Sequence, residues 1–321
     1  MAIISAQNVT KRFVRRQGWF RQASSHVVTA VDHLELVVEE GEFLGILGPN
    51  GAGKSTTIKM LTGILHPTEG TIEVAGWSPQ RHRMRLALNI GIVFGQRSQL
   101  WWDLPLKQSF AILQRMYRVK TPEYRVRLDQ LEVLLDLRAF WDTPVRQLSL
   151  GQRMRGELAA AMLHAPKLLF LDEPTIGLDV EAKAAIRQFL RSVNRESGTT
   201  IILTTHDMSD VEELCQRIVV IQHGHTAFDG TLEQLHQQVG VPSTMTVTFA
   251  QAIRSDVAAT VDGEVQVEGR RVTVGFNRVI HHPLSLIDQM RKWGDVVDIQ
   301  MADPPLDVVM RELYHSVGQT P

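Results

Sequence analysis

The chain has 321 residues, of which 44% are hydrophobic and 21% charged, with a formal net charge of −1 and a pI near 6.9. This composition excludes a disordered chain, and the balanced charge argues against a nucleic-acid-binding protein, which usually carries a basic face. The single cysteine, Cys215, excludes an internal disulfide framework, and no apolar run reaches the roughly 18 residues of a membrane-spanning helix.

Short apolar runs alternate with helical patterns up to about residue 238, which predicts an α/β core. The runs EFLGIL (42–47), KLLFLD (167–172) and TTIILTT (199–205) are predicted buried strands. Residues 181–196 carry their apolar side chains on one helical face. A strand, a helix and a second strand in this order predict a parallel pair joined by a crossover.

Two other regions differ in pattern. From about 104 to 165, leucines and aromatic residues recur at helical spacing with no strand pattern between them, which predicts a helical insert in the α/β core. Residues 243–321 predict a small α+β domain, ferredoxin-like if a short helix forms near 253–259. Its predicted strands are 244–250, 264–268, 271–276 and 296–301, and its further helices are 284–293 and 306–316.

The segment GPNGAGKST (48–56) fits the phosphate-binding pattern G-x-x-x-x-G-K-[ST], with a strand before it and a helix after it. Glycines allow backbone N–H groups to close around phosphate oxygens, and the helix N-terminus adds positive charge. We expect Lys54 to reach the β- and γ-phosphates, Ser55 to bind Mg²⁺ and Thr56 to add a phosphate contact. The remaining phosphate-binding residues would be Gly48, Pro49, Asn50, Gly51, Ala52 and Gly53.

The strand LLFLDEPT (168–175) ends in two acids. In P-loop NTPases an Asp at such a position helps to hold Mg²⁺, so Asp172 is a predicted metal ligand. Glu173 is the predicted general base, or the residue that positions water, for attack on the γ-phosphate of ATP.

The segment LSLGQ (148–152) opens a predicted helix. Ser149 is a good N-cap and Gln152 completes a capping box, so the segment is explained by helix capping alone. The alternative is a second anion site made by a hydroxyl, a glycine N–H and the helix dipole.

The order of these motifs, with Gln96, TIGLD (175–179) and His206, closely resembles the ATP-binding subunit of an ABC transporter over residues 1–238. The resemblance implies two subunits that enclose two ATP molecules head to tail. It implies that Gln96 senses Mg²⁺ and the attacking water, and that His206 contacts the γ-phosphate. Across the dimer it implies that Asp179 links the two sites, and that the γ-phosphate is capped by Ser149, Gly151 and Gln152.

Some positions depart from the family pattern. Leu150 stands where glycine is commonest and must be helical or extended. The role of the glutamine that senses Mg²⁺ is assigned to Gln96 and not to Gln99, because the number of residues between Gln96 and Leu100 matches the family. Phe13 is the predicted adenine-stacking residue, with Trp19 and Phe20 as alternatives and core packing as the other explanation.

Residues 14–27 form a predicted insertion at the tip of a hairpin. It is either solvated or in contact with anionic lipid headgroups or a membrane partner, because basic and aromatic residues together favour that interface. The residues concerned are Lys11, Arg12, Arg15, Arg16 and Arg21 around Trp19 and Phe20.

The motif set favours a transporter ATPase with separate permease subunits at the cytoplasmic face of the membrane. Importer ATPases and soluble ABC ATPases are the alternatives. The stretch SQLWWDLP and the C-terminal α+β pattern are similar to the exporter branch that moves drugs, lipids or polysaccharides. A complete motif set favours a homodimer over a heterodimer.

Two adjacent tryptophans, Trp101 and Trp102, follow Gln96 at the entry to the insert. Neighbouring side chains of an extended segment point in opposite directions. We therefore expect one ring to pack into the insert and the other to contact a permease subunit. The alternative is that both fill the core.

Overall fold

The computed structural model describes residues 1–17, 24–95, 97–254, 265–277 and 281–318. The chain divides into two units, Met1–Gly230 and Thr231–Pro321. The first unit therefore ends before the predicted boundary at 238–243. The difference is helix α8 (Leu232–Val239), which packs against α10 (Leu306–Gly318) within the second unit.

A six-stranded sheet forms the centre of the first unit, with the strand order β5-β6-β7-β3-β8-β9. The strands β6 and β7 pair in parallel, as do β3 with β7, β3 with β8 and β5 with β6, which confirms the predicted crossover unit. Only the last pair, β8 with β9, is antiparallel. The strands are β3 (Phe43–Leu47), β5 (Ile90–Phe94), β6 (Leu168–Asp172), β7 (Thr200–Thr204), β8 (Arg217–Gln222) and β9 (His225–Gly230).

Both faces of the central strands are covered, since β3 and β7 are buried at every position and β6 at all but its last, and alternate residues of a strand point to opposite faces. Leu169 and Leu171 belong to a core that contains the helical insert. Leu168 and Phe170 belong to a second core, beneath a three-stranded antiparallel sheet of order β2-β1-β4. The elements on that side are β1 (Ala2–Gln17), β2 (Ser24–Glu39), β4 (Glu69–Val74), α1 (Lys54–Leu61) and α2 (Arg83–Ala87).

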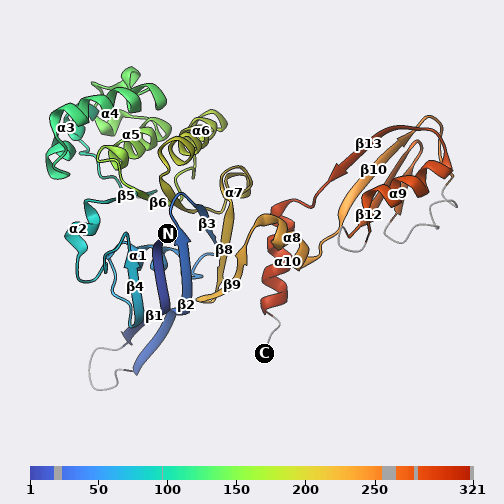
Figure 1. The fold of residues 1–321 in the computed structure, drawn as a ribbon, viewed down its shortest axis with the longest axis horizontal. Helices are drawn as coiled ribbons and strands as arrows, with labels where there is room; N and C mark the ends of the chain where they lie inside the picture. The colour runs from blue at the N-terminus through green and yellow to red at the C-terminus, as the bar shows by residue number, and fades with distance from the viewer. Residues whose placement is uncertain (18–23, 96, 255–264, 278–280, 319–321) are drawn as a thin grey trace. The chain divides into compact units, whose positions relative to one another are not determined.

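The predicted helical insert is present between β5 and β6, where the structure assigns no strand to residues 97–167. It groups α3, α4 and α5 beside β5 and β6, as the green part of Figure 1 shows. The crossover helix α6 (Val180–Ser197) and α7 (Met208–Leu214) follow. The insert consists of α3 (Leu106–Met116), α4 (Thr121–Leu134), α5 (Leu150–Met162) and two short 3₁₀ turns, Arg138–Phe140 and Val145–Gln147.

The predicted insertion at 14–27 extends the β1–β2 hairpin, whose described pairing reaches Gln17 and Ser24. The tip, with Trp19, Phe20 and Arg21, lies outside the described residues, so neither explanation of the insertion is tested.

The second unit contains an antiparallel sheet of order β11-β12-β10-β13 with one helix between β12 and β13. Alternate residues of β10 and β12 are buried with two residues of α9, which forms this unit's own core. Ile253 and Arg254 are not helical, and the rest of the predicted helix 253–259 lies outside the described residues. The elements are β10 (Ser243–Phe249), β11 (Val265–Glu268), β12 (Arg271–Phe276), α9 (Pro283–Met290), a 3₁₀ turn (Arg291–Trp293) and β13 (Val296–Ala302).

Candidate functional site

Four loops meet at one edge of the six-stranded sheet, because the carboxyl ends of parallel strands share an edge. β3 leads into residues 48–53, β5 into Gly95, β6 into Glu173 and β7 into His206. These loops surround a cleft of about 860 Å³. The cleft is lined by Gly48, Pro49, Asn50, Ser55, Lys59, Ile64, Phe94, Gly95, Arg97, Asp172, Glu173, Ile176 and His206.

The loop between β3 and α1 has a backbone that only glycine can form at two positions. Gly48 has φ +148, and a Cβ there would lie 2.1 Å from the carbonyl oxygen of Ile221. Gly53 has φ +116, and a Cβ there would lie 2.5 Å from the carbonyl oxygen of Ala30. Side chains are therefore excluded where the chain turns into α1, and the loop can approach an anion through its backbone.

Lys54 is the first residue of α1 and is 8% exposed. Its Nζ donates to the carbonyl oxygens of Gly48 at 2.7 Å and Pro49 at 3.1 Å. Burial lowers the pKa of Lys54, while the charges of Glu173 and Asp172 act to raise it. The ammonium is thus held inside its own loop, next to the place where backbone N–H groups can receive phosphate oxygens.

Asp172 and Glu173 stand at the carboxyl end of β6, beside β7. Thr204 donates through Oγ1 to Oδ1 of Asp172 at 2.5 Å, which fixes that carboxylate. Glu173 has φ +55, a left-handed conformation that is costly for a non-glycine residue and often marks a functional position. Its Oε1 lies 3.4 Å from Nδ1 of His206, whose side chain is 61% exposed.

Two basic residues of the cleft were not among the predicted site residues. Lys59 lies one turn after Ser55 on the same face of α1, a spacing that could have identified it. Arg97 comes directly after Gln96, the assigned glutamine, in the loop that follows β5. Both side chains add positive charge to a cleft that also contains Asp172 and Glu173.

The segment LSLGQ (148–152), predicted to act on the nucleotide of another subunit, lies outside the cleft. Ser149 caps α5 by accepting a hydrogen bond from the N–H of Gln152 at 3.2 Å, and the Gln152 side chain accepts from the N–H of Ser149 at 2.9 Å. This capping box confirms the capping prediction and leaves the anion-site prediction untested. Leu150 is the first helical residue, which is one of the two conformations predicted for it, and Gly151 follows it. Asp179 similarly caps α6, accepting from the N–H of Ala182 at 2.7 Å.

The two tryptophans have different environments. Trp101 packs against the core of the insert, and its backbone N–H donates to Oγ of Ser109 at 3.2 Å. Trp102 is 52% exposed, with the guanidinium of Arg153 at 5.8 Å from its ring centroid. One ring is therefore packed, as expected, and the other is about half exposed, while its predicted contact with a permease subunit is untested. Gln96 itself lies outside the described residues.

Phe13 lies on β1 opposite Val28, and its ring is 38% exposed. Nζ of Lys11 lies 5.2 Å from the ring centroid. Phe13 is not among the residues that line the cleft. An adenine ring lies a ribose and two phosphates away from a γ-phosphate, so the separation leaves the adenine-stacking prediction untested.

A buried carboxylate connects the segments that carry Glu173 and His206. Asp210 on α7 is 0% exposed. It accepts hydrogen bonds from the hydroxyl of Thr175, two residues after Glu173, and from that of Thr205 at 3.3 Å, directly before His206. The side chain of Asp210 therefore holds two loops of the cleft, the one that carries Glu173 and the one that carries His206.

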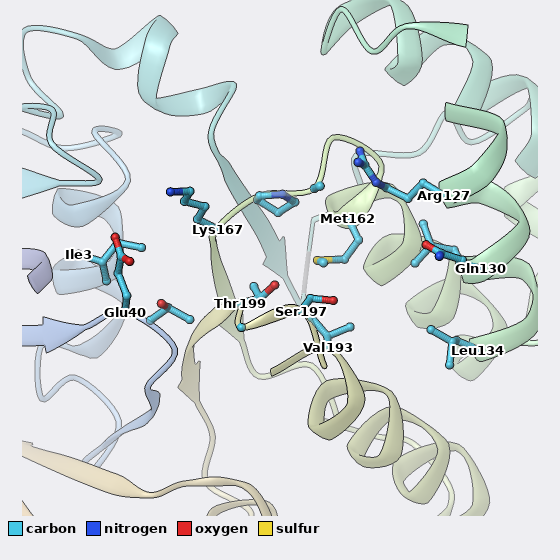
Figure 2. A pocket seen from close by; sticks show the side chains of 15 residues that line it. Ile3, Glu40, Arg127, Gln130, Leu134, Met162, Lys167, Val193, Ser197 and Thr199 are labelled. Carbon is cyan, nitrogen blue, oxygen red and sulfur yellow. The ribbon is translucent and has the colours of Figure 1, made fainter. Parts of the chain in front are cut away.

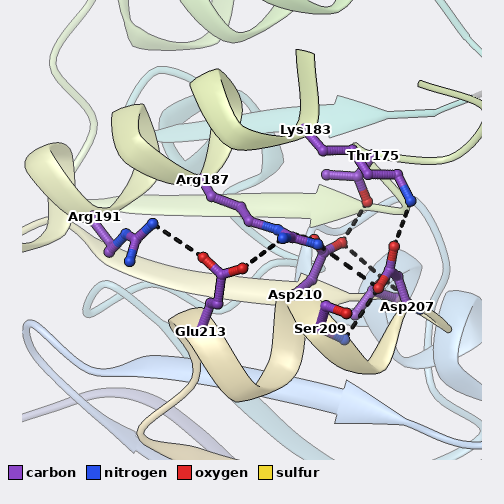
Figure 3. Close-up of polar contacts among 9 residues, drawn as sticks. Thr175, Lys183, Arg187, Arg191, Asp207, Ser209, Asp210 and Glu213 are labelled. Atoms are coloured by element: carbon purple, nitrogen blue, oxygen red, sulfur yellow. Dashed lines mark hydrogen bonds and ion pairs between the residues drawn. The ribbon is translucent and has the colours of Figure 1, made fainter. Parts of the chain in front are cut away.

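The charge of Asp210 is balanced from α6 (Figure 3). Nε of Arg187 donates to Oδ1 of Asp210 at 2.6 Å, and Nζ of Lys183 donates to Oδ2 of Asp207 at 2.5 Å. Burial acts to raise the pKa of Asp207, but the hydrogen bond and charge of Lys183 outweigh it and the pKa is lowered. The side chains of α6 and α7 thus form a closed ionic network, to which Arg191 and Glu213 add an exposed pair at 3.1 Å.

A second cavity, of about 290 Å³, lies at the opposite edge of the sheet. Figure 2 shows Lys167 and Thr199, which come directly before β6 and β7, facing Arg127 and Gln130 of α4. Its lining includes one acid, Glu40, and the hydroxyls of Ser197, Thr199 and Thr200, but none of its residues begins a helix, so it lacks the glycine-rich turn and helix N-terminus that Lys54 marks in the cleft. The phosphate chemistry therefore belongs to the cleft at the carboxyl ends of the strands.

The residues of the cleft fit a magnesium ion bound with a nucleotide. A hydroxyl from Ser55 and a carboxylate from Asp172 both line the cleft, and oxygen ligands of this kind suit Mg²⁺. Among the described residues, no group of three or more His, Cys, Asp or Glu side chains could hold a metal by itself. Also among them, no helix is both long and apolar enough to cross a membrane.

The chain is similar to proteins of one family. A family model described as ABC transporter matches residues 31–176. The ABC transporter ATP-binding protein NatA of Bacillus subtilis (strain 168) is 32% identical over 216 residues, which cover 67% of this chain and 87% of that protein. Two other relatives carry names with opposite directions of transport.

The first, the Nod factor export ATP-binding protein I of Sinorhizobium fredii (strain NBRC 101917 / NGR234), is 40% identical over 65% of this chain and 61% of its own length. The second, the methionine import ATP-binding protein MetN of Geobacillus kaustophilus (strain HTA426), is 36% identical over 73% of this chain and 66% of its own length. Among solved structures, a dimeric ATP-binding cassette in a post-hydrolysis state with ADP and Pi has a TM-score of 0.62 at 28% identity, covering 71% of this chain and 98% of that one.

Proposed function

The chain belongs to the ATP-binding subunits of ABC transporters and hydrolyses ATP, and on this premise we propose that it powers an exporter whose membrane-spanning subunits are separate polypeptides. The observation that carries the proposal is the convergence of four loops on one cleft. The loop before Lys54, Gly95 after β5, the acids Asp172 and Glu173, and His206 come from four separate parts of the sequence and meet there.

Each part of the cleft has a proposed role toward ATP. The backbone of residues 48–53 and the Lys54 ammonium bind the β- and γ-phosphates, with Thr56 as a further contact. Ser55, Asp172 and Gln96 hold Mg²⁺, which offsets phosphate charge when bound. Glu173 accepts a proton from the attacking water or orients that water, and His206 contacts the γ-phosphate. Phe13 stacks on adenine through its partly exposed ring.

The second half of the site comes from another subunit. Ser149, Gly151 and Gln152 lie outside the cleft of their own chain, at the exposed start of α5. We assign them to the γ-phosphate held by a partner subunit, where the positive end of α5 would face an anion. Asp179 would link the two sites. ATP then stabilises the dimer because each nucleotide binds both chains, and hydrolysis weakens it. A homodimer is favoured over a heterodimer because one chain carries every part.

Export is favoured over import by two features. The stretch that contains Trp101 and Trp102 and the α+β second unit are similar to the exporter branch, and a relative of 40% identity is named for export. The relative named for import is the reason to keep that direction as the alternative. The exposed Trp102 would contact a permease subunit at the cytoplasmic face of the membrane. The second unit would regulate or steady the dimer.

The test is to purify the chain with the subunits that bind it. A tagged chain carrying Glu173→Gln is expressed in its native cell, solubilised with ATP and isolated, and the co-purifying proteins are identified by mass spectrometry. We expect separate membrane-spanning subunits. Reconstitution of the wild-type complex in vesicles then decides direction, since export predicts ATP-driven movement away from the side that carries this chain. Movement toward that side would establish import, and a complex without membrane-spanning subunits would contradict the transporter assignment.

A further inference from the structure

Glu157 is a buried carboxylate on α5 that is bound to the segment after Gln96. Its side chain is 3% exposed. The hydroxyl of Ser98 donates to Oε1, and the N–H of Gln99 donates to Oε2 at 3.2 Å. Nε2 of Gln99 also donates to the carbonyl oxygen of Glu157 at 3.2 Å. Glu157 is therefore held by three hydrogen bonds from two consecutive residues of one loop.

No ion pair within the described part of the chain balances this carboxylate. Burial raises the pKa of Glu157, opposed by the hydrogen bonds from Ser98 and Gln99 and by the charge of Arg153. Burying a carboxylate is costly unless its oxygens are satisfied by hydrogen bonds. An apolar residue at this position of α5 would avoid that cost, so the contact to residues 98 and 99 is the feature that the glutamate adds.

The same face of α5 contacts the rest of this segment. A Cβ on Gly156 would lie 3.2 Å from Cδ1 of Leu100, so glycine permits a close approach of the helix to the loop. One turn earlier, the guanidinium of Arg153 lies 5.8 Å from the ring of Trp102. Positions 153, 156 and 157 share one helical face because residues three and four apart are neighbours on a helix. Residues 98–102 are thus attached along about one turn of α5.

The contact between residues 98–102 and α5 connects two parts of the proposed ATPase, the cleft and the start of α5. Toward the N-terminus, the N–H of Gly95 donates to the carbonyl oxygen of Asp172 at 2.8 Å, so the loop starts at the cleft. Along α5, Glu157 lies about 12 Å from Ser149, the helix cap, at 1.5 Å per residue. A shift of the loop would therefore move the start of α5 with it, because a helix transmits displacement as a rigid element.

We propose that Glu157 is a positioning residue that locks residues 98–102 to α5, so that ATP bound in the cleft changes how Ser149 is presented to a partner subunit. This inference rests on the proposed function, in which Ser149 acts on the partner's nucleotide. The glutamate has no contact with ATP in this role. It acts through the loop on one side and through the helix on the other.

The test uses the full chain in the Glu173→Gln background, so that bound ATP is not consumed, and compares Glu157→Gln and Ser98→Ala. Hydrogen–deuterium exchange is measured with and without ATP for residues 48–56 and 149–157. In the parent chain, ATP should protect both segments. In either variant, protection of 48–56 should remain while protection of 149–157 falls to the level without ATP, which a purely structural role would not produce.

The second readout is ATP turnover, which is measured in chains that keep the natural Glu173. We expect Glu157→Gln to lower kcat on the order of 10-fold, as the loss of a hydrogen bond to a charged group implies, with the Kd for a fluorescent ATP analogue within about 2-fold. The double variant Ser98→Ala/Glu157→Gln should lose no more than Glu157→Gln alone, because both remove the same interaction. Glu132→Gln is the matched control, since Glu132 belongs to the same insert and pairs with Arg138 at 2.9 Å.

Three outcomes decide the inference. Protection of 149–157 that persists in both variants, with kcat unchanged, would overturn it. If Glu157→Gln does not fold, the milder Ser98→Ala gives the answer by the same measurements. If ATP protects neither segment in the parent chain, the proposed function fails, and the role of Glu157 fails with it.

Discussion

Arg187 on α6 and Asp210 on α7 form a buried ion pair, with Nε of the guanidinium 2.6 Å from Oδ1 of the carboxylate (Figure 3). Asp210 is fully buried, and its other oxygen accepts from Thr175 and Thr205. The pair therefore supports the loops of both Glu173 and His206 without lining the cleft. The positions of Glu173 and His206 therefore depend on an ion pair between residues of two other segments of the chain.

Replacing Arg187 by leucine should destabilise the first unit by about 3–5 kcal/mol, because the buried charge of Asp210 would lose its partner. Denaturant unfolding measures the change. Arg191→Leu is the control and should cost at most about 1 kcal/mol, since both side chains of its pair with Glu213 are 40% exposed. Adding Asp210→Asn to Arg187→Leu should recover part of the loss. Equal effects of the two arginine substitutions would contradict a buried pair.

Replacing Glu173 by glutamine should lower ATP turnover by a factor of about 100 or more, because the amide cannot accept the proton of the attacking water. The Kd for ATP should stay within a few-fold, since Lys54 and the phosphate-binding loop are unchanged. Steady-state hydrolysis and size-exclusion chromatography with ATP measure turnover and a trapped dimer. Glu212→Gln, on the exposed side of α7, is the control. Near-normal turnover in Glu173→Gln would remove Glu173 from its proposed role.

The two tryptophans should give opposite phenotypes. Trp102→Ala should leave basal ATPase activity and stability nearly unchanged and reduce transport by the complex, because an exposed aromatic ring is a favoured interface anchor. Trp101→Ala should instead lower stability by roughly 2–3 kcal/mol, because its partly buried ring packs against the core of the insert. Vesicle transport and thermal unfolding separate the two effects, and Trp102→Phe should retain part of the coupling. Normal transport with Trp102→Ala would exclude the docking role.

His164 should make stability fall in mild acid. Burial lowers the pKa of His164 from 6.5 to about 4, and its Nε2 lies 3.0 Å from the carbonyl oxygen of Ile90, with its ring stacked on Tyr117. Arg127 is the charged neighbour that also lowers it. As pH falls, His164 of the unfolded chain takes up a proton at a higher pH than His164 of the folded chain. The contribution of this histidine to the free energy of unfolding is therefore complete above pH 6.5 and is lost as pH falls toward 4.

The variant His164→Gln should therefore lose less Tm than the natural chain between pH 6.5 and 4. Thermal unfolding at several pH values in that window measures the slope. His315→Gln, on the exposed side of α10, should follow the natural chain. If Tm falls equally with pH in His164→Gln and in the natural chain, protonation of His164 does not cause the loss of stability.

Several parts of the fold and the site could be predicted from local pattern. The phosphate-binding loop, the strands that end at Asp172 and Thr204, and the helical insert each have a signal within a short stretch of sequence. Such signals arise because buried strands are continuously apolar, helices repeat every 3.6 residues, and a tight anion-binding turn needs glycine. The parallel pairing of β6 and β7 also follows, because a one-sided helix joins them.

Other features depend on contacts between residues far apart in the chain, which no local pattern encodes. The hydrogen bonds of Glu157 to Ser98 and Gln99 span about 58 positions, and Arg187 meets Asp210 across 23. Trp101 and Trp102 are adjacent residues of the same type, so the sequence does not say which ring is buried. Only the packing of Trp101 against the insert distinguishes them. Helix α8 joins the second unit because α10, more than 60 residues later, covers it. The sequence by itself determined the phosphate-binding loop and the acid pair, because the residues within each of these motifs are adjacent in the chain. Tertiary structure decided which side chains hold the loops in register, because burial and pairing exist only after the chain has folded.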